Sequence, residues 1–138
     1  MGMVVVDTDV VSFIFKRDRR ARSFRRHLLG QTLVISFMTL AELRAWPLIH
    51  RWGPINRDRL ELHLRKYAVY FADEALCQCW AEVISQRRLQ GRPIDIADAW
   101  IAATAITLGV PLVTHNANDF ADVEGLTVLS EHGHPSQD

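Results

Sequence analysis

The stretch that decides the fold is MVVVDTDVVSF, residues 3–13. Its first part, Met3–Val6, is a short apolar run rich in β-branched valine, and it lacks the alternation of a half-exposed strand. Such a run is typical of a parallel strand that is buried on both faces. The run ends at Asp7, whose carboxylate would not be tolerated inside a buried strand. The sequence therefore predicts that Asp7 stands where this strand ends, which is where parallel sheets place their ligands.

The rest of the chain alternates predicted strands with predicted helices. Strands are expected over residues 32–37, 68–71, 112–114 and 126–129, and helices over 10–29, 39–46, 57–67, 74–89 and 95–108. Pro47 is expected to end or kink the second of these helices, because proline lacks the amide donor. The alternation predicts an α/β fold of three layers, α/β/α, in which helices flank a central parallel sheet of about five strands. For a chain of 138 residues, we expect one domain over residues 1–130 and a flexible tail over 131–138.

The composition excludes several classes of protein. The formal net charge is zero, so overall charge predicts neither nucleic-acid nor membrane binding, and no apolar run is long enough to span a bilayer. Cys77 and Cys79 form neither a zinc motif nor a disulfide framework, so we expect a reduced, cytoplasmic protein without a signal peptide. Basic residues gather over 16–26, which is typical either of a solvated helix face or of a surface that contacts anions.

Further acidic residues are expected at the same edge of the sheet as Asp7. Glu42, Asp98 and Asp119 each follow a predicted strand or begin a predicted helix. Each also has a purely structural interpretation. Thr39 and Glu42 match a capping box, Asp98 lies in the first turn of a helix, and Asp119 suits a turn. These interpretations explain single acids, but they do not explain why several acids converge on one edge.

A divalent cation would resolve the conflict among such carboxylates. Like charges raise one another's pKa, so several carboxylates do not crowd together without compensation. A cluster of oxygen ligands without Cys or His suits Mg²⁺ or Mn²⁺. A cation of this kind can activate a water molecule and stabilise the charge that develops when a phosphodiester bond is cleaved.

Four segments together carry a resemblance to a known family. They are VVVDTDVVS (4–12), TLAEL (39–43), DIADAWIAATA (95–105) and LVTHNANDF (112–120). In this order and spacing they resemble the PIN-domain ribonucleases, and in particular the VapC-type toxins of bacterial toxin–antitoxin pairs. The resemblance covers nearly the whole chain. It implies a metal-dependent endoribonuclease that cleaves tRNA or rRNA and is neutralised by a cognate VapB-type antitoxin. It also implies a homodimer that can join a larger toxin–antitoxin assembly.

The resemblance also implies which residues form the site. It makes Asp7, Glu42 and Asp98 the acids that bind Mg²⁺ or Mn²⁺. At the fourth acidic position of the family this chain has Asn116, where many relatives carry Asp, and then Asp119. We expect Asp119 to be the fourth acid and Asn116 to orient the site, with either one as a possible metal ligand.

Other positions receive supporting roles. Thr8 and Thr114 match family positions where a hydroxyl can hold a carboxylate or a water molecule, although each could equally bond to the backbone. Asp9 could hold a metal-bound water, but we favour it as the cap of the first helix. The arginines expected to contact RNA phosphates are Arg19, Arg22, Arg26 and Arg44.

Two alternatives to the nuclease stay open at this point. Asp7–Val11 also fits the D-x-D-x-[TV] motif of haloacid-dehalogenase-type phosphatases, in which the first Asp is the nucleophile. That chemistry needs a lysine near the phosphate, and neither Lys16 nor Lys66 is placed for it. The second alternative is a PIN-like module that binds RNA without cleaving it. The three core acids argue against such a module, whereas Asn116 at the fourth position keeps it open.

Overall fold

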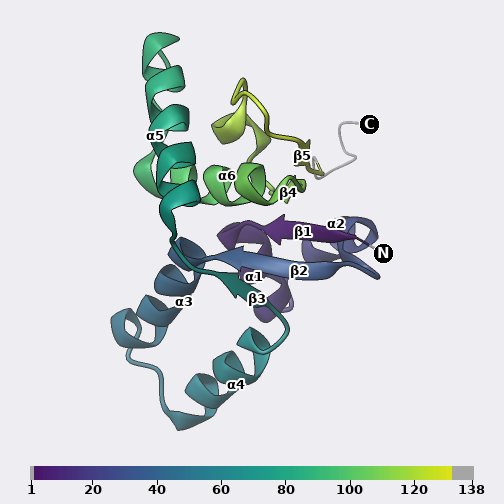
Figure 1. Cartoon of the computed structure of the whole chain (residues 1–138). Helices are drawn as coiled ribbons and strands as arrows, with labels where there is room; N and C mark the ends of the chain where they lie inside the picture. Colours follow the sequence, from purple (N-terminus) through teal and green to yellow (C-terminus); the bar gives the residue numbers. More distant parts are fainter. Residues whose placement is uncertain (1, 132–138) are drawn as a thin grey trace.

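A parallel five-stranded sheet forms the centre of the computed structural model, which describes residues 2–131 (Figure 1). The strand order is β3-β2-β1-β4-β5, and every neighbouring pair is parallel. The strands are β1 (Met3–Val6), β2 (Thr32–Ser36), β3 (Ala68–Tyr70), β4 (Leu112–Val113) and β5 (Val128–Leu129). The predicted α/β fold and its five strands are therefore confirmed. Most of the tail predicted to be flexible lies outside the described residues.

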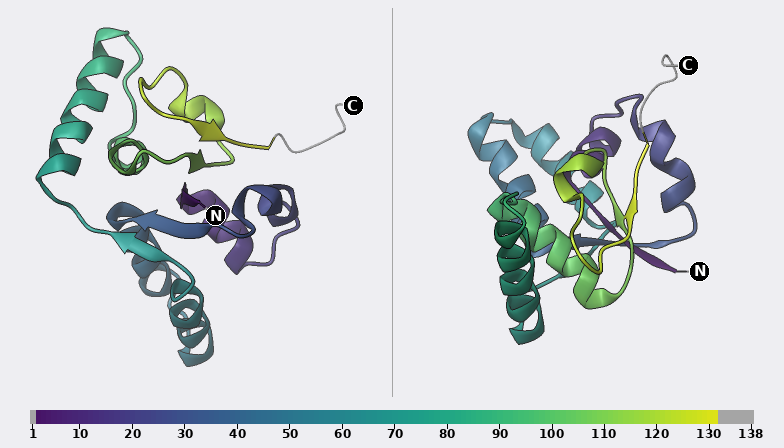
Figure 2. Two further views of the ribbon diagram at one scale, coloured as in Figure 1. Left: turned by 45° about the vertical axis from the view of Figure 1, so that its right-hand side comes forward. Right: turned by 90° about the horizontal axis from the view of Figure 1, so that it is seen from above.

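Helices cover both faces of this sheet (Figures 1 and 2). The helices are α1 (Thr8–Phe15), α2 (Ala21–Leu28), α3 (Phe37–Ile49), α4 (Pro54–Leu64), α5 (Glu74–Leu89) and α6 (Ile96–Leu108), with a 3₁₀ helix, η1 (Ala117–Phe120). Among residues 2–131, none of these helices is both long and apolar enough to cross a bilayer.

Strand β1 is buried on both faces, as its sequence predicts. Val4 and Val6 belong to a core cluster with residues of α1, α2 and α4. Val5 points to the other face and joins a cluster with residues of α5 and α6. Because side chains alternate along a strand, the run of valines serves both cores at once. β1 thereby occupies the middle of the sheet, and its end delivers Asp7 to the carboxyl edge.

The single helix predicted over residues 10–29 is wrong, because the structure has two helices there, α1 and α2. Between them Arg17 adopts a left-handed backbone with φ of 56°. The carboxylate of Asp18 accepts the backbone N–H of Arg20 at 2.9 Å and pairs with its guanidinium. Asp side chains that bond to nearby backbone compete with helical hydrogen bonds. This local turn therefore interrupts an otherwise helical pattern.

Helix α3 does not end at Pro47, contrary to the prediction for residues 39–46. It begins earlier, with Ser36 as N-cap accepting the N–H of Met38 at 3.0 Å, and it runs on to Ile49. The N–H of His50 donates to the carbonyl of Trp46 at 2.9 Å, so the helical pattern resumes after the proline. Pro47 itself is buried, and its packing offsets the one hydrogen bond that proline cannot make.

A buried histidine lies in the core between α1 and α4. The ring of His63 is 5.5 Å from that of Phe15 and 5.3 Å from that of Tyr67, and its Nε2 is 3.0 Å from the Tyr67 hydroxyl. Burial and, to a smaller extent, the charges of Lys66 and Arg59 together lower the pKa of His63 to about 4. The folded protein therefore holds this imidazole neutral.

We predict that His63 makes the free energy of unfolding depend on pH. Its pKa is lower when folded than the value of 6.5 that it has in model compounds, so its contribution is present above that value and is lost as the pH falls towards 4. Relative to His63→Gln, the wild-type chain should lose about 2 kcal/mol between about pH 7.5 and about pH 5. Urea unfolding at both pH values measures this difference, and a gap that does not change with pH would contradict the prediction.

Candidate functional site

Acidic side chains from four segments gather at the carboxyl edge of the sheet. β1 pairs with β2 on one side and β4 on the other, so the segments that follow these strands meet there. Helix α6 brings its first turn to the same edge. The acidic residues that the structure places in this region are Asp7, Asp9, Glu42, Asp98 and Asp119.

Asp7 is the most deeply buried of these acids, with 5% of its surface exposed. It is the N-cap of α1, and its Oδ1 accepts the N–H of Thr8 at 2.7 Å. Its Oδ2 accepts the hydroxyl proton of Thr114 at 2.7 Å. Burial, with smaller contributions from the charges of Asp9 and Asp98, raises the pKa of Asp7 to about 8, although the hydrogen bonds from Thr114 and Thr8 oppose this rise. The carboxylate is thus fixed in orientation but lacks a compensating charge.

Glu42 is held by a chain of hydroxyl groups. Its Oε1 accepts the proton of the Thr8 hydroxyl at 2.6 Å, and the Thr8 oxygen is 2.9 Å from the hydroxyl of Thr39. Because a hydroxyl has one proton, Thr8 donates to Glu42 and Thr39 donates to Thr8. The capping-box interpretation is therefore wrong: α3 begins at an earlier N-cap, Ser36, so Thr39 lies within the helix and is buried.

Asp98 lies in the first turn of α6, which follows the N-cap residue Asp95. Asp95 accepts two backbone N–H groups of that turn, including the N–H of Asp98 at 3.3 Å. Burial and, to a smaller extent, neighbouring negative charges together raise the pKa of Asp98 to about 6. The neighbours that act on it are Asp95, Asp119, Glu42 and Asp9. The first-turn position is therefore confirmed, but it does not explain why so many acids surround this one.

Asp9 is not the cap of the first helix, so that interpretation is wrong. The helix begins at Thr8, two residues earlier than expected, with Asp7 as its cap. Asp9 instead accepts the backbone N–H of His115 at 3.2 Å and the side-chain amide of Asn116 at 2.9 Å. It thereby ties α1 to the loop after β4, and burial raises its pKa as well. These contacts of Asp9 were not predicted, because the predicted helix started two residues too late.

Asp119 lies on the exposed η1 helix at the rim of the site. A small cavity of about 270 Å³ beside it is lined by residues 115–119. The N–H of Asp119 bonds to the carbonyl of Asn116 at 3.0 Å, so the turn interpretation holds for its backbone. Its carboxylate is nevertheless close enough to the other acids to raise the pKa of Asp98 and Asp9.

The donors at this edge have the chemistry of a hard divalent cation site. They are carboxylate, amide and hydroxyl oxygens, which Mg²⁺ and Mn²⁺ prefer. Within residues 2–131, no lysine or arginine forms an ion pair with any of the clustered acids. In the same range, no three acidic, histidine or cysteine side chains stand close enough to hold one ion as they are placed. The acids therefore share one edge of the sheet without forming a closed set of ligands, and their side chains would have to move closer together to hold a cation.

The arginines expected to contact RNA lie away from this edge or in ion pairs. Arg26 donates from Nε to Glu131 at 2.9 Å, and Arg44 on α3 pairs with Glu61 on α4. Arg19 is exposed in the turn before α2. The structure therefore brings none of these three guanidinium groups into direct contact with the acids.

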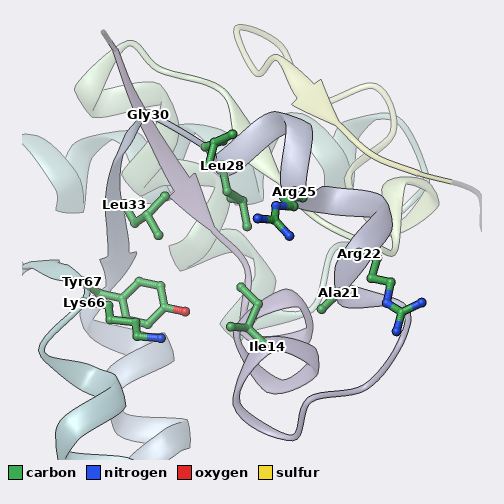
Figure 3. A pocket seen from close by; sticks show the side chains of 10 residues that line it. Ile14, Ala21, Arg22, Arg25, Leu28, Gly30, Leu33, Lys66 and Tyr67 are labelled. Atoms are coloured by element: carbon green, nitrogen blue, oxygen red, sulfur yellow. The ribbon is translucent and has the colours of Figure 1, made fainter.

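Arg22 belongs to a cavity of about 580 Å³ between α1, α2 and the end of α4 (Figure 3). Arg25 and Lys66 also lie at this cavity. Its other lining residues are mostly apolar, among them Ile14, Leu28, Leu33 and Tyr67. The cavity is thus an apolar hollow with a cationic rim.

Comparisons with known proteins agree with this architecture. The PIN domain family model matches residues 4–126. A relative called VapC ribonuclease Y4jK, from Sinorhizobium fredii, is 31% identical over 137 residues, covering 93% of this chain and 96% of the relative. A protein called Ribonuclease VapC1, from Haemophilus influenzae, is 29% identical over 128 residues, which cover 88% of this chain and 92% of that protein.

Solved structures show the same fold. VapBC-1 from nontypeable Haemophilus influenzae is similar with a TM-score of 0.78 at 26% identity, and covers 94% of this chain and 98% of its own. FitAcB from Neisseria gonorrhoeae is similar with a TM-score of 0.81 at 25% identity, covering 93% of this chain and 97% of its own. The chain therefore belongs to the PIN-domain family, and within that family to the VapC type.

Proposed function

We propose that this chain is a metal-dependent endoribonuclease that cleaves phosphodiester bonds in RNA and acts as the toxin of a toxin–antitoxin pair. The observation that carries the proposal is the cluster of acids at the carboxyl edge, which has no cationic side chain paired with it within residues 2–131. Relatives of similar length are named ribonucleases, which supports the activity. A tRNA or rRNA substrate and a cytoplasmic location fit this activity.

We propose Asp7, Glu42 and Asp98 as the residues that hold Mg²⁺ or Mn²⁺, with Asn116 and Asp119 as further candidates. Bound at this edge, such a cation would activate a water molecule and stabilise negative charge on the scissile phosphate. The chain's own contribution is to orient its ligands. Thr114 and the Thr8 N–H fix the Asp7 carboxylate.

Two further candidate ligands, Glu42 and Asn116, also make side-chain hydrogen bonds. The Thr8 hydroxyl aims Glu42, and the side-chain amide of Asn116 donates to Asp9, which supports an orienting role for Asn116. Preorganised donors of this kind reduce the reorganisation that the reaction requires.

Neither of the earlier alternatives is favoured by a specific observation. A phosphatase of the haloacid-dehalogenase type needs a lysine near Asp7. Lys16 instead lies over the ring of Trp46, 5.5 Å from its centroid, and Lys66 lines the apolar cavity. A binding module without catalysis would not require acids whose burial raises their pKa.

We propose a VapB-type antitoxin as the protein partner and a homodimer as the toxin unit. The similar solved structures named above include VapBC-1 from nontypeable Haemophilus influenzae, which supports a VapB-type partner. The cavity with the cationic rim supports a place for the antitoxin, since an apolar hollow beside Arg22, Arg25 and Lys66 suits an acidic amphipathic segment. Exposed arginines of the turn and of α2, such as Arg19, remain available for RNA phosphates.

The first prediction from this proposal concerns RNA cleavage. Purified chain, free of any partner, should cut a tRNA pool or total RNA into discrete fragments with Mn²⁺ or Mg²⁺, and should not cut with EDTA. Asp7→Asn and Asp98→Asn should each lower the rate by at least about 100-fold, since a metal ion contributes several kcal/mol to transition-state stabilisation.

The control for this assay is Asp58→Asn, which changes an exposed acid of α4 away from the edge. It should cleave like the wild-type chain. Cutting that persists in both site variants would reveal a contaminant, and a folded chain that cuts no RNA with any metal would favour the module that only binds.

The second prediction concerns stability, because Asp7 is costly to bury as an anion. Its pKa is higher when folded than when unfolded, so its contribution to stability is lost as the pH rises towards about 8. With EDTA present, Asp7→Asn should therefore melt several degrees higher than wild type at about pH 8, and by less at about pH 6.

Mn²⁺ separates this effect from ordinary stabilisation. It should raise the melting temperature of the wild-type chain and of Asp58→Asn, but hardly that of Asp7→Asn. An Asp7→Asn chain that melts lower than wild type in EDTA, or that responds to Mn²⁺ as strongly as wild type, would contradict the role of Asp7.

A further inference from the structure

Arg87, near the end of α5, is a buried arginine without a carboxylate partner in the described part of the chain. Only 5% of its surface is exposed. Its guanidinium donates to three backbone carbonyls instead, from Nε to Arg92 at 2.7 Å, and from Nη1 to Ala121 at 3.0 Å and Asp119 at 3.4 Å. Burying a charge is expensive unless it is well hydrogen-bonded. An apolar residue would fill this space at lower cost, so the donors themselves need an explanation.

The three carbonyls belong to the two segments that carry acids of the site. The carbonyl of Arg92 lies in the loop between α5 and α6, which leads directly into Asp95 and Asp98 at the start of α6. The carbonyls of Asp119 and Ala121 lie in η1 and at its end. One guanidinium therefore joins the backbone before Asp98 to the backbone of Asp119 itself.

Two glutamines on the same end of α5 hold a neighbouring segment without touching Asp119. The amide of Gln86 donates to the carbonyl of Asp122 at 2.8 Å and accepts the N–H of Glu124 at 3.1 Å. The amide of Gln90 donates to the same carbonyl of Asp122 at 3.3 Å. Side chains at the end of α5 thus form hydrogen bonds with residues 119–124. Within residues 2–131, Arg87 is the one side chain that donates to the carbonyl of Asp119.

We propose that Arg87 is a positioning residue of the nuclease site, which fixes Asp119 relative to Asp98. The proposal rests on the proposed function. Asp119 is exposed on a 3₁₀ helix of four residues, where its N–H bonds to the carbonyl of Asn116 and the neighbouring Phe120 is buried. The carbonyl bonds from Arg87 add the constraint that links this short helix to the segment before Asp98. Groups behind a metal site that hold its ligands typically influence metal affinity or activity by about 10- to 100-fold, because small displacements of a catalytic group have large effects on rate.

The test compares Arg87→Met with Gln90→Ala, in the full chain and well below the melting temperature of each. Methionine fills similar space but donates no hydrogen bond. Mn²⁺ affinity is measured by titration calorimetry on the folded protein, and kcat and KM are measured on a short RNA substrate. We expect Arg87→Met to bind Mn²⁺ about 10-fold more weakly and to lose at least about 10-fold in kcat, with a smaller change in KM. Gln90→Ala should keep both values within about twofold of wild type.

Arg87→Lys provides the conservative comparison. Its ammonium keeps the charge and can reach a carbonyl, so it should fall between wild type and Arg87→Met in Mn²⁺ affinity. If Arg87→Met does not fold, Arg87→Lys is compared with Gln90→Ala on the same measurements. If neither variant folds, Arg87 serves the fold alone and the proposal is overturned.

The remaining outcomes are also decisive. An Arg87→Met chain that melts lower but keeps the Mn²⁺ affinity and kcat of wild type would show a structural role alone and would overturn the proposal. The same holds if Gln90→Ala loses as much affinity as Arg87→Met. A wild-type chain that neither binds Mn²⁺ nor cleaves RNA would overturn the proposed function itself, and this role with it, so the two failures are distinguishable.

Discussion

The buried carboxylate of Asp7 is the constraint on which the rest of the site depends. It stands at the end of the central strand, where the same residue must end β1, cap α1 and face the other acids. Burial alone would favour its protonated form. The hydroxyl of Thr114 and the N–H of Thr8 hold its two oxygens in separate directions, so its orientation is set before any ligand arrives.

Each of the neighbouring acids is held by a different element, and this distributes the repulsion over the fold. Glu42 is oriented by the hydroxyl of Thr8, the first residue of α1. Asp98 is fixed by the first turn of α6. Asp9 is engaged by the loop after β4. The helices that carry these residues are anchored in two separate cores, so the repulsion between the acids is opposed by the packing of several helices. Sites built on helices and strands hold their side chains more precisely than sites on loops.

The sequence predicts the sheet well because the signal for buried parallel strands is local. The valines of β1, for example, form such a pattern within four residues. The errors arise where distant contacts or single turns decide. The break between α1 and α2 depends on the side chain of Asp18, and the passage of α3 through Pro47 depends on burial of that residue. The role of Arg87 could not be predicted from the sequence, because its partners are backbone carbonyls, which every residue has.

The lack of an ion pair with these acids in the described part of the chain is a property of the arrangement and not of the composition. The chain has as many lysines and arginines as aspartates and glutamates, 16 of each. Within residues 2–131 several arginines pair with acids elsewhere, such as Asp18, Glu61 and Asp122, and others donate to carbonyls, as Arg87 does. An ion pair at the edge would lower the pKa of the acids and stabilise the fold, but it would also occupy the oxygens that a divalent cation needs. The fold therefore gives up stability at this edge, as functional sites commonly do, and keeps its negative charge open to a cation from outside the chain.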